Sequence, residues 1–412
     1  MGFGSQSFGD LEKEYVLRVL DKKRVFRFGG DQAESEAKLL EQRYKERTGA
    51  PYCLAVNSGT SAIIATLIGA GIGPGDEVII PAYTYVATAA AVLIARAVPV
   101  IVEVDDSLTM DPQACEAAIT PSTKAIMPVH MRGIPSQMDE LMAIARKHSL
   151  LLIEDVAQAN GSSYKGKALG TIGHAGCFSF QESKVITAGE GGMILTNDGK
   201  LFTRASMYHD TALSFWQRYE PETLGLNDAN EMIPFPGEDY RMSEIHAAIA
   251  LAQTERLDGF LAGLRRSKRM IVAGIRDLPQ IQLQRVPDPE GEGAYQVIFY
   301  MPTVEQTKKF ASLLNAEGVR SSTTNDAFPD RHIYKNWDYI MDKRPISEKD
   351  NPWTNEHYKG NVHYSRDMCP RTMDWLTRAV TIGLHPNMDE EQCRRIVAAI
   401  RKTAASFEPI KR

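Results

Sequence analysis

One lysine lies in the chain where a free cation is unexpected. The stretch from Gly176 to Asp198 predicts a strand over residues 177–180 and a second strand over residues 193–195, with Lys184 in the turn between them. Desolvating an ammonium group between core strands is unfavourable, so Lys184 needs a function or a route to water. A lysine amine can condense with an aldehyde cofactor and form a Schiff base. The alternative is a lysine that extends from a strand end into solvent.

Asp155 is the second candidate for chemistry, because it ends the apolar run Leu150 to Asp155. A carboxylate at the end of a buried strand needs a partner. A pyridinium nitrogen is one such partner, since it keeps a pyridoxal ring electron-withdrawing. The other interpretation is a cap for the following turn. The presence of Lys184 one strand later favours the pyridoxal interpretation.

The turn from Asn57 to Ser61 follows a short apolar strand over residues 52–56 and precedes a helix over residues 62–70. Free backbone N–H groups and the helix dipole at such a turn favour a phosphate. An ordinary N-cap by Ser58, Thr60 or Ser61 is the alternative. The turn lacks the Gly-Lys-Ser/Thr sequence of a Walker loop.

The elements that must position these residues alternate between strands and helices, which predicts an α/β fold with a mainly parallel sheet. Further strands are expected at residues 77–80, 98–104 and 125–129, and helices at 10–20, 32–47, 111–119 and 137–148. Sites in such sheets lie beyond the carboxyl ends of the strands. Asn57 to Ser61, Tyr83 to Tyr85, His130 and Asp155 are therefore expected to share one crevice.

A second, smaller α+β domain is expected after the large one, which gives domains over residues 1–258 and 259–412. A helix is expected over residues 244–258, and a further helix over residues 259–276 is expected to bridge to the second domain. The segment 211–235 has no clear period and is interpreted as a long functional loop, and residues 336–371 are expected to be rich in loops.

The bulk properties of the 412-residue chain are those of an ordinary globular protein. Its net charge of −5 argues against a nucleic-acid or anionic-membrane surface. Its five cysteines lie far apart in the sequence, which predicts neither a metal site nor disulfides and fits a cytoplasmic location. The most apolar window, residues 87–104, is interrupted by Arg96 and Pro99, and no signal peptide is expected at the N-terminus.

Together these features resemble the fold-type-I pyridoxal-phosphate enzymes, and most closely the DegT/DnrJ/StrS family of sugar aminotransferases. The resemblance covers nearly the whole chain and is strongest from Leu54 to Leu195. Five runs carry it, in order along the sequence: residues 57–62, 73–78, 154–159, 178–192 and 240–244. It implies a large domain with a mainly parallel, seven-stranded sheet.

The resemblance also implies roles for individual residues. Lys184 is the Schiff-base lysine, which also moves a proton. Asp155 pairs with the pyridine nitrogen of pyridoxal 5'-phosphate, Gln158 approaches the ring hydroxyl and Tyr85 stacks on the ring. The phosphate is held by Thr60, by the amides of Gly59 and Ser61, and by Ser179. The candidate substrate residues are Arg241, His332 and Tyr334.

The family is dimeric, and the loop before Arg241 is expected to reach the partner's site. The chain departs from the family at Asp239, where the usual Asn contacts the phosphate across the dimer. An Asp would repel a phosphate dianion. Either Asp239 points elsewhere, or Asn227, Asn230 or Arg241 compensates its charge.

The implied reaction transfers an amine from glutamate or glutamine to a keto or aldehyde carbohydrate in amino-sugar biosynthesis. The residues 127–131 are similar to aminohydroxybenzoate synthases and cyclitol aminotransferases, and residues 287–291 and 334–337 resemble enzymes that aminate an octulosonate. The acceptor, the aminated carbon and the donor therefore stay open. A pyridoxal-dependent sugar dehydratase is one alternative, although many such dehydratases carry His at the position of Lys184. A non-catalytic regulatory module is the other alternative.

Overall fold

The computed structural model describes residues 3–29, 32–212, 233–324 and 329–410. In these ranges, seven strands form the large sheet, in the order β1-β9-β8-β5-β4-β2-β3. All neighbouring pairs are parallel except those made by β9, so the sheet is mainly parallel, as predicted. In the same order the strands span Tyr52–Val56, Gly192–Thr196, Ala175–Ser179, Leu151–Asp155, Thr123–Ile126, Glu77–Pro81 and Val98–Val102.

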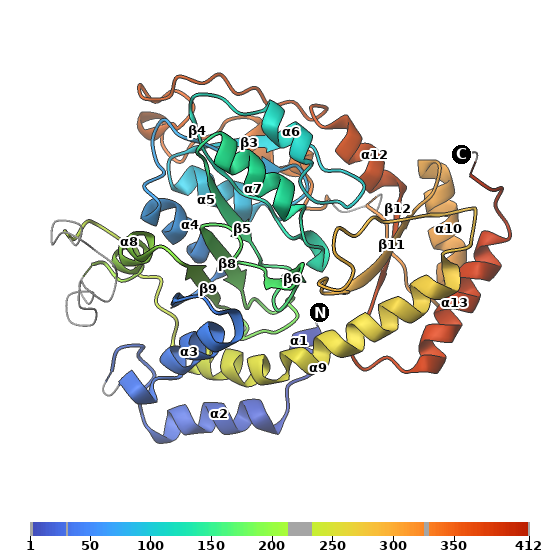
Figure 1. Cartoon of the computed structure of the whole chain (residues 1–412), viewed down its shortest axis with the longest axis horizontal. Helices are drawn as coiled ribbons and strands as arrows, with labels where there is room; N and C mark the ends of the chain where they lie inside the picture. The colour runs from blue at the N-terminus through green and yellow to red at the C-terminus, as the bar shows by residue number, and fades with distance from the viewer. Residues whose placement is uncertain (1–2, 30–31, 213–232, 325–328, 411–412) are drawn as a thin grey trace.

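Helices cover both faces of the large sheet (Figure 1). One face packs against α4 (Gly59–Gly69), α5 (Ala87–Ile94) and α8 (Gly199–His209). The other face packs against α3 (Glu36–Thr48), α6 (Pro112–Ala117), α7 (Met138–Lys147) and α9 (Glu244–Ile275). The strands β2, β8 and β9 are buried along their whole length, which explains why they lack the alternation of a half-exposed strand.

A smaller antiparallel sheet, β10-β11-β12, lies beside the large one. Its strands are Gln282–Leu283, Gln296–Tyr300 and Ala379–Gly383. The helices α10 (Val304–Ala316), α12 (Pro370–Arg378) and α13 (Glu390–Ala404) belong to the same unit. This arrangement confirms the α/β large unit with a smaller α+β unit.

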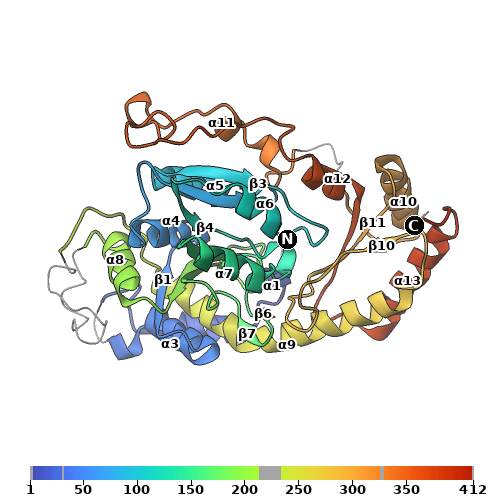
Figure 2. The same cartoon turned by 45° about the horizontal axis from the view of Figure 1, so that its top comes forward.

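One continuous helix, α9, replaces the two helices expected over residues 244–276. Figures 1 and 2 show α9 running from beneath the large sheet to the small sheet. Gly259 was expected to begin a new helix, but a glycine inside a helix costs only about 1 kcal/mol, which the packing on both sides offsets. The boundary predicted at residue 258 lies inside this helix, and the division into two domains stays a prediction.

The segment that follows the small unit's first two strands crosses back over the large sheet (Figure 2). It carries α11 (Asp338–Met341) and buries Ile333, Trp337 and Ile340 against the large core. The remaining short elements are α1 (Phe3–Gln6), α2 (Asp10–Asp21) and the β6-β7 pair (Ser163–Tyr164 and Lys167–Ala168). None of the helices in the described ranges combines the length and apolar character that crossing a bilayer requires.

Candidate active site

A cavity of about 400 Å³ lies beyond the carboxyl ends of β5 and β8. Its walls come from six separate parts of the chain, which the fold brings together at one edge of the sheet. The residues that define its chemistry are Gly59, Thr60, Thr84, Tyr85, Thr88, Asp155, Gln158, Ser179, Lys184 and His332. Most of the residues predicted for the site therefore do share one crevice.

Lys184 lies in the loop between β8 and β9, and its side chain lines this cavity. Within the described residues its ammonium group makes no hydrogen bond or ion pair. Burial lowers the pKa of Lys184, and the nearby Arg132 guanidinium lowers it further, while Asp155 acts in the opposite direction. A lowered pKa increases the fraction of neutral amine, the form that attacks an aldehyde.

Asp155 ends β5 and is only 3% exposed. Ala157 N–H donates to its Oδ1 (3.0 Å), and the Thr88 hydroxyl donates to its Oδ2 (2.8 Å). Burial raises the pKa of Asp155, whereas these two donors lower it. A protonated ring nitrogen in the cavity would supply the cationic partner that the buried carboxylate lacks.

The N-terminus of α4 forms the opposite wall. Ser58 caps this helix, because its hydroxyl accepts the Ser61 N–H (3.0 Å). The amides of Gly59 and Thr60 have no acceptor among the described residues and open toward the cavity. A Cβ at Gly59 would lie 2.7 Å from the Ser179 Cβ, so only glycine allows Ser179 to approach this turn. Two free amides, two hydroxyls and a helix dipole fit a phosphate group.

Ser61 was predicted to hold the phosphate, and the structure corrects this assignment. Its amide is already bonded to Ser58, and its hydroxyl donates to Asn57 Oδ1 (2.6 Å). The side chain is 6% exposed. The N-cap alternative is thus confirmed for Ser58, and the phosphate interpretation of Gly59 and Thr60 stays a prediction.

Gln158, Tyr85 and His332 surround the remaining opening of the cavity. Gln158 Oε1 accepts the Arg132 N–H (3.2 Å), which holds its amide in place. The Tyr85 ring is 42% exposed and lies 5.3 Å from the His332 ring, centroid to centroid. His332 comes from the returning segment, whose backbone is fixed because Thr84 N–H donates to His332 O (2.9 Å).

Two residues for which a role at the site was expected lie in the core instead. Tyr334, a predicted substrate residue, is fully buried, and its hydroxyl donates to Arg366 O (2.6 Å). His130 is also fully buried. Ser136 N–H donates to His130 Nδ1 (3.0 Å), so the protonated Nε2 donates to Glu154 Oε2 (3.1 Å). The polar atoms of both side chains form hydrogen bonds inside the core, so neither side chain points into the cavity.

Asp239 and Arg241 do not line the cavity of their own chain. Arg241 forms ion pairs with Asp239 and Asp210, so it compensates the charge of Asp239 as one of the two predicted explanations requires. The Asp239 carbonyl accepts from Asn57 Nδ2 (3.4 Å), which places this segment beside the turn before α4. The other two proposed helpers, Asn227 and Asn230, lie outside the described residues, as does most of the loop 211–235.

Thr88 and Arg132 are site residues that the sequence reasoning did not identify. Thr84 and Thr88 lie four residues apart around the start of α5, and their hydroxyl oxygens are 2.7 Å apart. Because the Thr88 hydroxyl donates to Asp155, the Thr84 hydroxyl donates to Thr88. The spacing of the two threonines is the signal that could have revealed this chain of donors.

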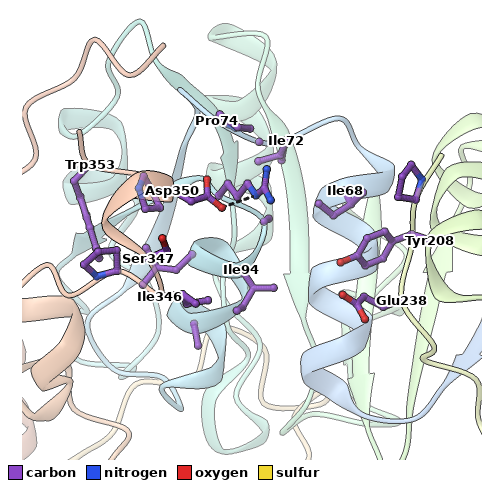
Figure 3. A pocket seen from close by; sticks show the side chains of 18 of the residues that line it. Ile68, Ile72, Pro74, Ile94, Tyr208, Glu238, Ile346, Ser347, Asp350 and Trp353 are labelled. Atoms are coloured by element: carbon purple, nitrogen blue, oxygen red, sulfur yellow. Dashed lines mark ion pairs between the residues drawn. The ribbon is translucent and has the colours of Figure 1, made fainter. Parts of the chain in front are cut away.

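A larger cavity, of about 1010 Å³, lies away from these residues (Figure 3). Ile68 and Ile94, near the C-terminal ends of α4 and α5, line it, whereas the first residues of the same helices line the Lys184 cavity. Nine residues of helix separate Gly59 from Ile68, a rise of about 13 Å. The ion pair between Arg96 and Asp350 (3.1 Å) forms part of its wall. This cavity therefore lies toward the C-terminal ends of α4 and α5, away from the Lys184 cavity at their N-terminal ends.

Comparison with known proteins gives three concordant results. The model of the DegT/DnrJ/EryC1/StrS aminotransferase family matches residues 7–350. GDP-perosamine synthase of Caulobacter vibrioides is 39% identical and covers 81% of both chains. UDP-N-acetyl-3-dehydro-alpha-D-glucosamine 3-aminotransferase of Acidithiobacillus ferrooxidans is 34% identical over 90% of this chain and 89% of the relative.

Solved structures share the whole fold. The aminotransferase from Psychrobacter cryohalolentis superposes with a TM-score of 0.77 at 26% identity, over 97% of this chain and 98% of the other. 3-Amino-5-hydroxybenzoic acid synthase gives the same TM-score at 27% identity and the same coverage. The fold and the arrangement of its two sheets are thus those of fold-type-I pyridoxal-phosphate enzymes.

Proposed function

Because the chain belongs to the DegT/DnrJ/EryC1/StrS family of pyridoxal-phosphate-dependent aminotransferases, we propose that it transfers an amine from glutamate or glutamine to a carbohydrate-type carbonyl. The observation that carries this proposal is the pairing of Lys184 and Asp155 in one cavity. Burial lowers the pKa of Lys184 and so favours its neutral amine. It raises the pKa of Asp155, whose carboxylate forms no ion pair with any of the described residues.

The residues fit the cofactor along its whole length. Gly59, Thr60 and Ser179 would hold the phosphate, Asp155 the ring nitrogen, and Lys184 the aldehyde carbon. Gln158 and Tyr85 would contact the ring on the remaining sides. When bound, pyridoxal phosphate supplies an electron-withdrawing ring that stabilises negative charge on the carbon being deprotonated.

The chain's own residues then handle the protons. Asp155, fixed by Thr88 and the Ala157 amide, would keep the ring nitrogen of a bound cofactor protonated. The Lys184 amine, when free, would accept and return the proton that the transfer moves. This transfer needs a neutral amine that does not compete with a nearby carboxylate, and within the described residues Lys184 has no ion-pair partner.

The acceptor class rests on the relatives. GDP-perosamine synthase, the UDP-linked 3-aminotransferase and the L-glutamine:scyllo-inosose aminotransferase of Streptomyces griseus, which is 36% identical over 69% of this chain, are all named for sugars or cyclitols. We propose an acceptor of this kind, in amino-sugar biosynthesis. Lys184 also separates this proposal from dehydration, because a histidine in its place can move protons but cannot form a Schiff base.

A homodimer in the cytoplasm is also proposed. Support comes from large apolar side chains exposed on and after α2, of which Leu17, Leu20, Val25 and Phe26 are 47–56% exposed. Several large apolar side chains exposed within one short segment are consistent with an interface. The Asp239–Arg241 segment lies beside Asn57. In a dimer this segment would be able to reach the partner's cavity.

The test is a half-reaction followed by absorption. Adding glutamate or glutamine to the loaded enzyme should shift the visible band to shorter wavelength, and a suitable keto sugar should restore it. Lys184→Ala should lose both the band and turnover, whereas Lys308→Ala, an exposed lysine on α10, should behave as wild type. An enzyme whose band responds to no amino acid would contradict the aminotransferase proposal.

A further inference from the structure

A third cavity, of about 310 Å³, is linked to the Lys184 cavity by two hydrogen bonds, although no residue lines both cavities. Arg132 lines the third cavity, and its backbone N–H donates to the side chain of Gln158, which lines the Lys184 cavity. Asp330 lines the third cavity, and the side chain of His332, which lines the Lys184 cavity, donates to it (2.6 Å). Arg132 is also near enough to Lys184 for its charge to lower the pKa of that lysine.

Arg132 is the only arginine or lysine among the described residues that line this third cavity. Its Nε and Nη2 both donate to the Tyr83 hydroxyl oxygen (3.0 and 2.8 Å), and its Nη1 has no acceptor in the described part of the chain. No carboxylate there lies within 4.0 Å of it. The one carboxylate in the cavity wall, Asp330, is instead bonded to both the backbone N–H and the ring of His332.

The backbone at Arg132 is also unusual. Its φ of 58° and ψ of 23° put a non-glycine residue in the left-handed region, which costs roughly 1–2 kcal/mol. Strain of this kind is retained where the surrounding structure needs one side chain in one place. In this conformation the backbone N–H of Arg132 donates to Gln158 and its side chain lines the third cavity. One residue therefore contacts the walls of both cavities.

The rest of the cavity suits a short carbon chain with oxygen atoms. Ser322 and Thr324 supply hydroxyl groups, and Leu108 and Ile298 supply apolar surface. A half-buried guanidinium without an ion-pair partner is incomplete, and a planar carboxylate matches its geometry. The volume is adequate for a five-carbon dicarboxylate.

We propose that Arg132 binds a carboxylate of the amino donor, and that the third cavity holds the donor beside Lys184. This inference rests on the proposed aminotransferase function and narrows it to donors that carry a carboxylate within reach of Arg132. The test below distinguishes whether the bound group is the carboxylate next to the amine or the one on the side chain.

The first experiment measures binding without reaction. Glutarate has no amine, so its dissociation constant for the loaded enzyme can be measured by calorimetry. Arg132→Met should weaken glutarate binding roughly ten- to a hundredfold, because a charge-assisted hydrogen bond is lost. Arg132→Lys should retain part of the affinity. Tyr83→Phe, which removes the acceptor hydroxyl but leaves the guanidinium, should bind glutarate within about threefold of wild type.

The second experiment follows the donor half-reaction by absorption. Arg132→Met should require correspondingly higher glutamate, with little change in the rate at saturation. If glutamine is affected as strongly, Arg132 binds the carboxylate next to the amine; if glutamine is unaffected, it binds the side-chain carboxylate. Either result supports the proposal.

Two outcomes would overturn it. Unchanged glutarate affinity in Arg132→Met, with the wild-type absorption band as evidence of folding, would show that Arg132 is not a carboxylate site. A weakened acceptor half-reaction with a normal donor half-reaction would assign the residue to the acceptor. If Arg132→Met does not fold, the same comparisons apply to Arg132→Lys. A wild-type enzyme that binds glutarate but responds to no amino donor would contradict the proposed function and not the anion site.

Discussion

At the scale of single residues, the orientation of Asp155 depends on a chain of donors. Thr84 donates to Thr88, and Thr88 donates to Asp155, while the Ala157 amide holds the second carboxylate oxygen. Both oxygens are thus fixed, and the carboxylate can address only one direction, the cavity. If Asp155 pairs with the cofactor's ring nitrogen as proposed, the two threonines would influence that nitrogen without touching it.

Replacing Thr88 should expose this dependence. Thr88→Val removes a donor to the ionised carboxylate, which raises the pKa of Asp155, because that hydrogen bond favours the charged form. Cofactor binding that requires the anion should then be lost at a pH roughly one unit higher than in wild type. The measurement is the cofactor dissociation constant as a function of pH. Thr88→Ser, which keeps the hydroxyl, is the control. If all three proteins lose cofactor affinity at the same pH on acidification, the role given to Thr88 is contradicted.

The buried ring of His209 is expected to make the free energy of unfolding depend on pH. The ring is 3% exposed, its Nδ1–H donates to Ser206 O (2.5 Å), and its Nε2 has no partner among the described residues. Burial lowers the pKa of His209 to about 4. The unfolded chain binds this proton near pH 6.5 and the folded chain does not, so stability is complete above pH 6.5 and falls as the pH approaches 4.

The expected loss from this one residue is on the order of 3 kcal/mol at pH 4 relative to pH 7. Urea midpoints of wild type and His209→Asn, which keeps a donor for Ser206, should converge as the pH falls. A parallel decrease in the two proteins would show that His209 titrates normally in the folded state.

The residues that the sequence alone identified share one property: each is conspicuous against its neighbours. Lys184 is a charge between apolar strands, and Asp155 is an acid at the end of a buried one. Thr88 and Arg132 are not conspicuous, because a hydroxyl in an alanine-rich helix and an arginine in a loop are common. Their roles arise from partners 67 and 49 residues away, Asp155 and Tyr83, which only the fold brings together.

At the scale of elements, the large sheet was predictable because its strands are apolar on both faces and alternate with helices. The elements that were missed have weaker local signals. The helix α8 was not recognised although Asp198 caps it with bonds to two backbone amides. The helix α12 and strand β12 were also missed, since they follow each other directly and leave no turn residues between them. The strand β12 is completed by long-range pairing with β11, a contact that local pattern does not reveal.

Two glycines in α9 predict opposite effects of the same substitution. A Cβ at Gly259 would meet nothing within 4 Å, whereas a Cβ at Gly263 would lie 2.1 Å from the Pro386 carbonyl oxygen. Gly259→Ala should therefore raise the free energy of unfolding by about 1 kcal/mol, because alanine favours the helix and restricts the unfolded chain. Gly263→Ala should lower it by about 1–3 kcal/mol. Urea denaturation measures both, and a destabilising Gly259→Ala would show that α9 is bent or packed differently at that point.

At the scale of the whole molecule, the cavity described here is built from one chain, yet the segment from Asp239 to Arg241 lies at its edge and not in its lining. The exposed Leu17 and Leu20 belong to α2. This helix lies at the periphery of the molecule, beyond α3 and α9 (Figure 1). Both observations are explained if two copies associate and each completes the other's site.

Mixing two inactive variants tests this arrangement. If sites are shared, dimers that combine Lys184→Ala with Arg241→Ala contain one intact site, and random exchange should restore about a quarter of wild-type activity. A mixture of Lys184→Ala and Asp155→Ala is the control, because both defects lie in the cavity of their own chain and no intact site can form. No recovery in the first mixture, with exchange demonstrated, would place Arg241 in its own chain's site.

The unbroken helix α9 also constrains how the chain can change in length. Its first half packs against α2 and α3, and its second half against α13 and β11, so its 32 residues span about 48 Å and set both the distance and the rotation between the two sheets. Inserting one residue would turn everything beyond it by about 100° and swing the small sheet away from its place beside the cavities. Even two full turns, which nearly restore the rotation, would move it by about 10 Å. Insertions and deletions among relatives are therefore expected in the surface segments that cross the large sheet. The helix over residues 244–275 is expected to keep its length, because its length sets the distance and rotation between the two sheets.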